Sequence, residues 1–492
     1  MNWGMRVARA VAVMALALVT ACRSSKPAAW PHPSDDGRET LTLAEARADL
    51  AVFLATLHEA HPGYYRYTPR DSFARLEKSV GSALSEGMTR IEFYRTLYPI
   101  YAAIRDGHTK FYPSEKEGSW IPFNGDRLIP LVLHVDGRRA WILEDVSRTV
   151  PPGAEVISID GLPVSGLIDD LLPRAVFSDG WGTERNSLEL GRHFAAYHAA
   201  FIGAADSYEL SLRGASEALA DLSFVTVPAV DERKLLEARS LQDRPDPLGF
   251  EVREDGTAIL RIGLFSKAGL KGSFPGFLRD AFSRIRREGI GRLVIDLRDN
   301  EGGTDAYGAL LYSYLADAPF RYYDRIETSA AWSFTTSRYM RLPWYFPLYR
   351  MFVRANADGA AWNHHRNLRM LSPRPDAFRG SLAVVSNGRS FSVTSEFLSA
   401  VRTHKRGIVV GTESGGAYGG NTSGIFWAIA TLPHSRLAIG IPTWSYYLRV
   451  DPVQPLDRGI LPDVEVRPSI EDLLSGRDPV LEEALEAVAS TG

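Results

Sequence analysis

The stretch Leu293-Val294-Ile295-Asp296-Leu297 is followed by Arg298-Asp299-Asn300-Glu301-Gly302-Gly303. The first part is a short apolar run, typical of a strand that is buried on both faces of a sheet. The second part is a turn in which paired glycines let backbone N–H groups come close to a ligand. A tight turn that needs positive φ explains the same glycines, and this stretch alone favours that simpler interpretation.

On both sides of this stretch, segments typical of strands alternate with segments typical of helices. The pattern predicts strands at 258–264, 293–297, 382–386 and 408–411, and helices at 277–287, 307–315 and 392–404. Such alternation predicts an α/β fold with right-handed βαβ units and a mainly parallel sheet. We assign residues 250–470 to this domain. An aromatic-rich insertion at 318–380 is either a lid over a site or a packed element with no chemical role.

The preceding regions differ in character. Residues 39–118 are predicted to be a helical domain, with capping boxes at Thr42/Glu45 and Thr89/Glu92. Its last helix is expected to stop near Gly107, which leaves His108 on a loop. Residues 119–235 are expected to be a β-rich module with a helical insert, because 152–161 resembles the carboxylate-loop and strand region of PDZ domains. Residues 471–492 are predicted to be a C-terminal helix.

The N-terminus has the features of an export signal. Two arginines precede an apolar run at 10–19, which is too short to span a bilayer comfortably. Val19-Thr20-Ala21-Cys22 resembles a bacterial lipobox, which implies cleavage before Cys22 and lipidation of its thiol. We therefore expect a lipoprotein signal peptide at 1–21 and a polar tether at 22–38; a plain secretory signal is the alternative. The chain would be anchored in the cell envelope, facing outside the cytoplasm, and periplasmic in a Gram-negative cell.

Composition narrows the remaining classes. The chain has 492 residues, 45% of them hydrophobic, and a net charge of −3, so it is globular and gives no general reason to expect a nucleic acid partner. A single cysteine excludes an intrachain disulfide framework and a cysteine-based zinc site. His364-His365 lacks a carboxylate or third ligand at metal spacing, which argues against a zinc site. The sequence shows no phosphate-binding loop motif either. We therefore predict no metal and no cofactor.

A second motif, Ser390-Phe391-Ser392-Val393, also follows a strand and opens a helix. A serine there sees the positive end of the helix dipole, although a plain N-cap role for Ser392 explains the residue type as well. A serine nucleophile needs a base. Lys405 is more than three turns down the same helix and points away, which leaves His108 as the best base.

Taken together, these motifs resemble the tail-specific, or carboxyl-terminal processing, serine peptidase family. The resemblance is to the branch related to tricorn protease and interphotoreceptor retinoid-binding protein modules, and it spans roughly residues 40 to 470. The matching pieces, in family order, are His61–Tyr65, Asp106–Thr109, Val294–Gly303, Ser390–Ser392, Val409–Glu413 and Gly459–Asp463.

The resemblance implies a crotonase-like ββα-spiral catalytic core with a helical N-terminal domain and a PDZ-like module. It also implies that Ser392 is the nucleophile and His108 the base. Backbone N–H groups of Gly302, Gly303 and Val393 would form the oxyanion hole. The expected substrate is a polypeptide.

Several positions depart from the family pattern. Ala417 stands about where one branch has a catalytic lysine, and Ser395 replaces a usual glutamate. Leu456 stands where an acidic residue is expected. The group that orients His108 is therefore open among Asp106, Glu413 and Asp457, each of which is also explained as a cap or surface charge. His61 is best explained as a helix stop.

Two functions follow from these features. The first is a membrane-anchored, extracytoplasmic serine peptidase that uses Ser392 and His108. The alternative is a catalytically inactive family member that acts as a ligand-binding or scaffold lipoprotein, which the missing lysine and acidic residues also fit. The separation between His108 and Ser392 in the folded chain distinguishes the two.

Overall fold

The computed structural model describes residues 40–113, 127–214, 223–242, 248–266, 272–329, 339–341, 353–356, 359–423 and 428–490. The chain from Leu41 onward forms one compact unit. The predicted signal peptide, Cys22 and tether lie outside the described residues, as do 330–338, 342–352 and 357–358 of the aromatic insertion. Within the described ranges, no helix combines the length and hydropathy needed to cross a membrane.

Three helices follow the short strand β1 (Thr40–Leu41): α2 (Leu43–Ala60), α3 (Arg70–Ala83) and α4 (Arg90–Ile104), with β2 (Met88–Thr89) before α4. Both predicted capping boxes are confirmed, at the starts of α2 and α4. The end of α4 differs from the expectation, because Arg105 rather than Gly107 takes the left-handed C-cap conformation, with φ 54°. Gly107 serves close packing instead, since a Cβ there would lie 2.1 Å from the Phe177 carbonyl oxygen.

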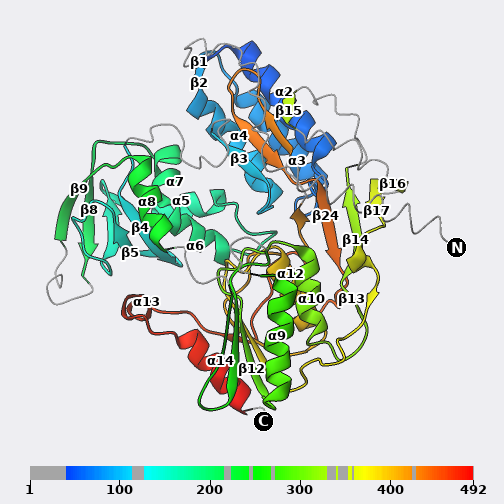
Figure 1. The fold of residues 1–492 in the computed structure, drawn as a ribbon. Coiled ribbons are helices and arrows are strands. Elements are labelled where there is room, and N and C mark those ends of the chain that lie inside the picture. Colours follow the sequence, from blue (N-terminus) through cyan, green and yellow to red (C-terminus); the bar gives the residue numbers. More distant parts are fainter. Residues whose placement is uncertain are drawn as a thin grey trace. The chain divides into compact units, whose positions relative to one another are not determined.

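Strands from the end of the chain complete the helical region. β3 (Lys110–Tyr112) pairs with β23 (Ala438–Ile441), which pairs with β22 (Ala428–Thr431), which pairs with β15 (Met340–Arg341). Apolar side chains of β22 and β23 belong to the same hydrophobic core as those of α2 and α4. Figure 1 shows these late strands beside the early helices. This packing brings the loop after α4 close to late parts of the chain.

An antiparallel module follows, formed by the described residues between 127 and 242. Its sheet has the order β4 (Leu131–Asp136), β5 (Arg139–Asp145), β6 (Glu155–Ile159), β8 (Ser207–Arg213), β9 (Ser223–Pro228), with β7 (Leu162–Pro163) on β6. The predicted helical insert is confirmed as α5 (Val164–Leu171), η1 (Leu172–Arg174), α6 (Glu184–Arg192) and α7 (Phe194–Phe201), and α8 (Glu232–Gln242) follows the sheet. The predicted Asp160-Gly161 turn has φ 48° and 76°, which fits a tight hairpin.

The central sheet has the order β10 (Leu248–Val252), β11 (Thr257–Ile262), β12 (Arg292–Asp296), β19 (Ser381–Ser386), β20 (Ile408–Gly411), β25 (Val464–Glu465). All pairings except β10–β11 are parallel, as predicted. Leu293 and Ile295 share a core with α9 (Phe274–Arg287), α10 (Asp305–Ser313) and α12 (Val393–Thr403), whereas Val294 packs with α14 (Pro479–Ser490). Helices therefore cover both faces of the sheet (Figure 1).

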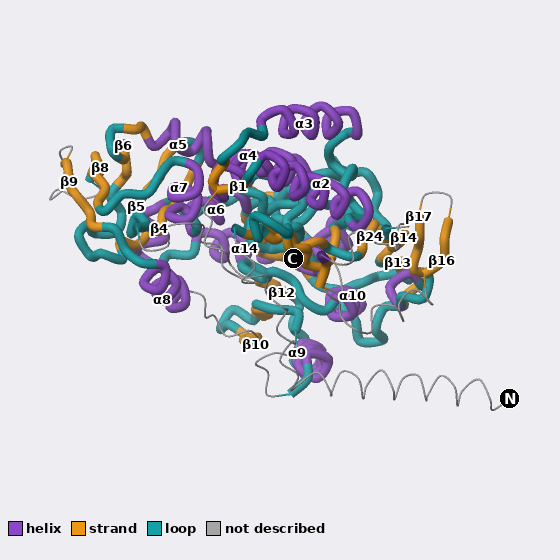
Figure 2. The backbone as a smooth tube through the Cα atoms, turned by 90° about the horizontal axis from the view of Figure 1, so that it is seen from above, coloured by secondary structure: helices purple, strands orange, loops and turns teal. Residues whose placement is uncertain are grey.

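The insertion contributes to a second sheet. Its strands β14 (Tyr323–Thr328), β16 (Val353–Asn356) and β17 (Gly359–Trp362) join the later β21 (Thr422–Ser423) and β24 (Trp444–Leu448). Figure 2 shows β14, β16, β17 and β24 gathered together. Short elements β13 (Phe320–Arg321), η5 (Arg366–Leu368) and β18 (Met370–Leu371) complete the insertion. At the C-terminus, Gly476 has φ 74° and separates α13 (Ile470–Ser475) from α14, where a single helix was expected.

Candidate active site

Ser392 occupies the turn between β19 and α12, at the carboxyl end of a parallel strand. It has φ 56° and ψ −124°, a conformation that costs energy for any residue with a Cβ. Its side chain makes no capping hydrogen bond, in contrast to Thr42 and Thr89 at the starts of α2 and α4. The plain N-cap interpretation of Ser392 is therefore wrong, because the turn holds the hydroxyl away from the helix N–H groups.

Neighbouring hydrogen bonds fix this turn. The Phe391 N–H donates to the Asn300 carbonyl at 3.0 Å, and Ser390 Oγ donates to the Leu297 carbonyl at 2.9 Å. Ser395, which replaces the family's glutamate, donates from its Oγ to the Ser390 carbonyl at 2.9 Å. These bonds tie the turn before α12 to the turn after β12, so the strained Ser392 backbone is well supported.

Of the two predicted glycines, Gly302 lies directly against Ser392 and Gly303 packs against Phe265. A Cβ at Gly302 would be 2.7 Å from Ser392 Cβ, and one at Gly303 would be 2.3 Å from the Phe265 carbonyl oxygen. The Gly302 N–H donates to Asn300 Oδ1 at 2.9 Å, so it does not offer a free donor as the sequence analysis expected. Gly302 instead permits close approach. For the N–H groups of Gly303 and Val393, the described residues provide no acceptor.

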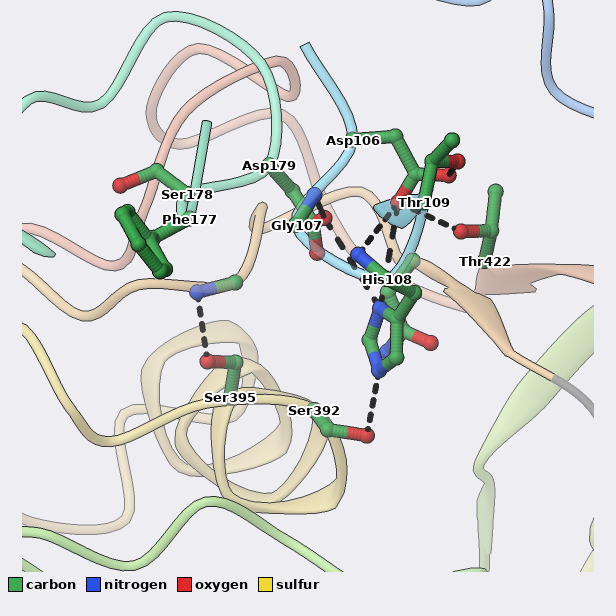
Figure 3. Close-up of polar contacts among 12 residues, drawn as sticks. Asp106, Gly107, His108, Thr109, Phe177, Ser178, Asp179, Ser392, Ser395 and Thr422 are labelled. Atoms are coloured by element: carbon green, nitrogen blue, oxygen red, sulfur yellow. Dashed lines mark hydrogen bonds and ion pairs between the residues drawn. The ribbon is translucent and has the colours of Figure 1, made fainter. Parts of the chain in front are cut away.

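His108 lies on the loop between α4 and β3, and its Nε2 is 3.2 Å from Ser392 Oγ. The two residues are 284 positions apart in the sequence, yet both side chains are almost fully buried. The Phe391 ring stacks on the imidazole, with ring centroids 4.5 Å apart. Figure 3 shows the imidazole between the Ser392 hydroxyl and the carboxylates of Asp106 and Asp179. The structure therefore brings the two predicted catalytic side chains together.

The electrostatic surroundings keep the imidazole neutral. Burial is the main cause that lowers the pKa of His108, to about 3. The Asp106 carboxylate opposes this effect, while the positive charges of Lys110 and Arg185 add to it. A neutral imidazole can accept a proton at Nε2, which is the nitrogen that faces Ser392.

Asp106 is the hub of the loop. Its Oδ1 accepts from the His108 backbone N–H at 2.9 Å and from Thr422 Oγ1 at 2.7 Å, and its Oδ2 accepts from Thr109 Oγ1 at 2.6 Å. His61 Nε2 is 3.1 Å from the same Oδ2. Burial alone would raise the pKa of Asp106, but the His61 hydrogen bond and the nearby histidines outweigh it and hold the pKa well below its usual range.

His61 combines two roles. It is the C-cap residue of α2, as the helix-stop interpretation predicts. Its Nδ1 accepts from the Gly63 N–H at 3.0 Å, so the ring proton is on Nε2 and is donated toward Asp106 and Thr109. His61 therefore fixes the loop that carries His108 and does not itself approach Ser392.

The sequence analysis missed a second carboxylate, that of Asp179, which also lies near the Nδ1 atom of His108. His108 Nδ1 is 3.9 Å from Asp106 Oδ1 and 4.0 Å from Asp179 Oδ1. Asp179 lies between η1 and α6 of the antiparallel module, in a loop without any motif that would single it out.

Neither of the two other predicted orienting residues forms an ion pair with His108 within the described part of the chain. Glu413 pairs with Arg458 at 2.7 and 2.9 Å. Asp457 contributes its backbone carbonyl to the Trp181 N–H at 2.8 Å. Of the three candidates from the sequence, only Asp106 adjoins His108.

His108 and the two carboxylates beside it have the composition of a metal site. Asp106, His108 and Asp179 each place one ligand atom within 4.8 Å of the others. However, both Asp106 oxygens already accept hydrogen bonds, and the cationic side chains of Lys110 and Arg185 are close enough to His108 to lower its pKa. A cation would be repelled here, so this arrangement is better suited to moving a proton than to holding a metal.

Residues 256–466, which include the central sheet, match the model of peptidase family S41. Over this part, which is less than half of its length, the chain is similar to peptidase family S41. It is accordingly a serine-type peptidase, a hydrolase whose substrates are polypeptides. No curated protein sequence matches the chain.

Solved structures support the same fold. A crystal structure of mature CPAF aligns with 91% of this chain and 97% of that chain, at 14% identity and a TM-score of 0.59. A CPAF mutant aligns with 92% and 98%, at 13% identity and a TM-score of 0.61. The structure of mature CPAF complexed with lactacystin aligns with 90% of this chain and 97% of that chain, at 14% identity and a TM-score of 0.59. At these identities the likeness shows the fold alone.

Proposed function

We propose that this protein is a member of peptidase family S41 that is anchored to a membrane outside the cytoplasm and cleaves peptide bonds with Ser392 as nucleophile and His108 as general base. One observation supports the assignment above all: Ser392 Oγ is 3.2 Å from the Nε2 of a buried imidazole and makes no capping bond. A nucleophile within hydrogen-bond reach of a base is the arrangement that acyl transfer requires.

In the proposed reaction, His108 Nε2 takes the proton of the Ser392 hydroxyl as Oγ attacks the scissile carbonyl carbon. The carbonyl oxygen becomes an oxyanion, and the imidazolium then gives its proton to the leaving amine. Water, activated by the same imidazole, hydrolyses the acyl-enzyme and regenerates the serine. The N–H groups of Gly303 and Val393 are the proposed oxyanion donors. Val393 follows Ser392 in the chain, Gly303 follows Gly302, which lies against Ser392, and neither N–H has an acceptor among the described residues.

For the domain architecture we propose a crotonase-like core for the central sheet and its helices, and a PDZ-like identity for the antiparallel module. The Asp160-Gly161 hairpin and the five-strand antiparallel order support the second assignment. Strand β4 is at the edge of this sheet, but α6 packs against it so closely that a Cβ at Gly191 would lie 2.2 Å from the Leu133 carbonyl oxygen. We therefore assign the module no peptide-binding role at that contact.

The nucleophile is tested with purified protein and a labelled unfolded substrate such as fluorescent casein. Ser392→Ala should abolish hydrolysis and keep the circular dichroism spectrum, whereas Ser399→Ala, two turns along the same helix, should keep activity. Hydrolysis that survives in pure Ser392→Ala protein contradicts the assignment. A folded wild-type protein without any hydrolysis favours the ligand-binding or scaffold alternative.

The membrane anchor is tested separately. The full-length wild-type chain should partition into the detergent phase of a Triton X-114 extract and incorporate labelled fatty acid, because lipidated Cys22 would be its attachment point. Cys22→Ala should move to the aqueous phase and lose the label. Equal partitioning of both proteins contradicts the lipoprotein proposal and leaves the catalytic one standing.

A further inference from the structure

We infer that Asp179, which the antiparallel module carries into the active site, is the positioning residue that orients His108 for catalysis. The inference rests on the function proposed above. Distance does not choose between the two candidate carboxylates, because Asp106 and Asp179 are 3.9 and 4.0 Å from His108 Nδ1. The two carboxylates differ instead in their remaining capacity to accept a hydrogen bond, and this difference selects Asp179.

An ionised carboxylate offers about four acceptor sites. Asp106 uses two on each oxygen: for the His108 backbone N–H and Thr422, and for Thr109 and His61. Asp179 accepts from the Gly107 N–H on Oδ1 at 2.9 Å, and its Oδ2 is buried with no partner among the described residues. Only Asp179 can accept another proton donor without breaking an existing bond.

His108 supplies the matching unpaired atom. Its Nδ1 is also buried without a partner among the described residues. When Nε2 acts as the base toward Ser392, Nδ1 must carry the ring proton. That proton needs an acceptor, and a modest rotation of the Asp179 carboxylate toward Nδ1 provides it. Hydrogen bonds of unliganded active sites are often long and tighten when substrate binds.

The loop that holds Asp179 is fastened to the catalytic region by its backbone. The Asp179 N–H donates to the Gly415 carbonyl at 2.9 Å, and the Gly180 N–H donates to the Arg105 carbonyl at 2.7 Å. Gly180 has φ 69°, and a Cβ there would lie 1.9 Å from the Asp457 carbonyl oxygen. On the other side, Asn186 Oδ1 accepts the N–H groups of residues 177 and 178. The helical insert therefore has a function in this chain, which is to deliver a carboxylate to the base.

Several charged groups act electrostatically on the pair. Asp106 on the His108 loop, Lys110 on β3, Arg185 on α6 and Arg66 from the helical region act on one or both of the two residues. Burial first, and then the Asp106 charge, raise the pKa of Asp179 well above its ordinary value. Loss of activity at acidic pH should therefore report the His108–Asp179 pair as a unit rather than His108 alone.

The test compares Asp179→Asn with Asp179→Glu and the matched neighbour Ser178→Ala, on casein peptides. Asp179→Asn should lower kcat by about 10³–10⁴-fold with KM within a few-fold, because an amide can hold the imidazole in the wrong tautomer. Asp179→Glu should recover part of kcat, and Ser178→Ala should stay within about twofold of wild type. The acid limb of kcat/KM should move to lower pH in Asp179→Asn, since the imidazolium loses its carboxylate.

The order of the two substitutions separates a positioning role from a packing role. If Asp179 only fills space, the isosteric Asn should work better than the longer Glu, and that order overturns the inference. Wild-type kcat and an unchanged acid limb in Asp179→Asn also overturn it, while loss of activity in Ser392→Ala would still uphold the proposed function.

A nitrogen NMR measurement on the wild-type protein covers the case in which Asp179→Asn does not fold. A His108 resonance with the proton on Nδ1 is the expected result. A neutral ring protonated on Nε2 overturns the inference.

Discussion

Two buried histidine–aspartate groups meet at the loop after α4, and they differ in how completely they are hydrogen bonded. In the first, His61 and Asp106 use every acceptor of the carboxylate and both ring nitrogens of the histidine. In the second, His108 and Asp179 leave Nδ1 and Oδ2 without partners among the described residues, although both atoms are buried.

The difference indicates what each group does. Buried polar atoms in folded proteins are nearly always satisfied, and an exception calls for a functional explanation. The satisfied group stabilises the loop, because removing any member leaves a buried partner unpaired. The unsatisfied group, which also contacts Ser392, retains capacity to bind and move a proton. Each prediction below tests this division, from the largest expected effect to the smallest.

The largest effect is expected at His108. His108→Ala should lower kcat by about 10⁵–10⁶-fold, because it removes the base that activates the serine. The melting temperature should change little, since the ring makes few hydrogen bonds that the fold needs. His61→Gln should show the reverse, with a lower melting temperature and kcat within about tenfold. Equal losses of activity in the two folded variants would erase the distinction between the groups.

The next effect is one of stability. Asp106→Asn places an amide against His61 and Thr109, both of which donate to Oδ2. We expect a loss of about 4 kcal/mol, the range found when one partner of a buried charged network is removed. Urea unfolding followed by circular dichroism measures it. A midpoint equal to that of wild type would show that Asp106 is not the structural hub.

Glu396 provides a third, pH-dependent test of the division between fully hydrogen-bonded structural groups and unsatisfied functional groups. This carboxyl is one turn beyond Ser392, but both its oxygens accept hydrogen bonds, from Tyr323 at 2.7 Å and Asn421 at 3.0 Å. It therefore belongs to the satisfied, structural class. Burial first, opposed by the Tyr323 bond and aided by Asp305, raises its pKa to about 7. Glu396→Gln should leave kcat unchanged.

The stability of that variant should depend on pH. Since the folded pKa of Glu396 is above its ordinary 4.5, its contribution is complete below about pH 4.5 and is lost as the pH rises through about 7. Glu396→Gln should therefore match wild type near pH 5 and exceed it at pH 8, by on the order of 2–3 kcal/mol. Asn421 Oδ1, which has no partner among the described residues, can accept from the new amide. Thermal unfolding of both proteins at the two pH values measures this difference. An equal difference in melting temperature between variant and wild type at both pH values would contradict the raised pKa of Glu396.

The smallest effect is expected at Glu413, which the sequence proposed as an orienting residue. Its buried carboxylate accepts two hydrogen bonds from a partly exposed Arg458, so Glu413→Gln should cost about 1–2 kcal/mol of stability without changing the reaction. Steady-state kinetics should show kcat within twofold of wild type. A drop of a hundredfold or more would place Glu413 in the catalytic machinery.

Most of the central domain could be predicted from the sequence, because its signals are local. The apolar run at 293–297 became β12, and the boxes at Thr42 and Thr89 became helix starts. The pairing of β3 with β23 could not be predicted, since the contact joins segments some 330 residues apart. The left-handed Arg105 was also missed, because sterics favour glycine for that conformation.

The residues of the candidate active site likewise fall into those that the sequence could predict and those that it could not. His108, Ser392 and the oxyanion role of the glycine turn could be proposed from motifs whose order resembles a family. Asp179 lies in no motif, and its role depends on where the antiparallel module places it. The occupied N–H of Gly302 was equally hidden, because the acceptor is a side chain whose rotamer follows from packing.

The most direct test of the whole account is active-site labelling with a fluorophosphonate, followed by mass spectrometry of the tryptic peptides. We predict a single adduct on Ser392 in the wild-type protein, formed at least a hundredfold more slowly in His108→Ala. Labelling of Ser392 at the same rate in both proteins, or of a different serine, would contradict the claim that His108 activates Ser392.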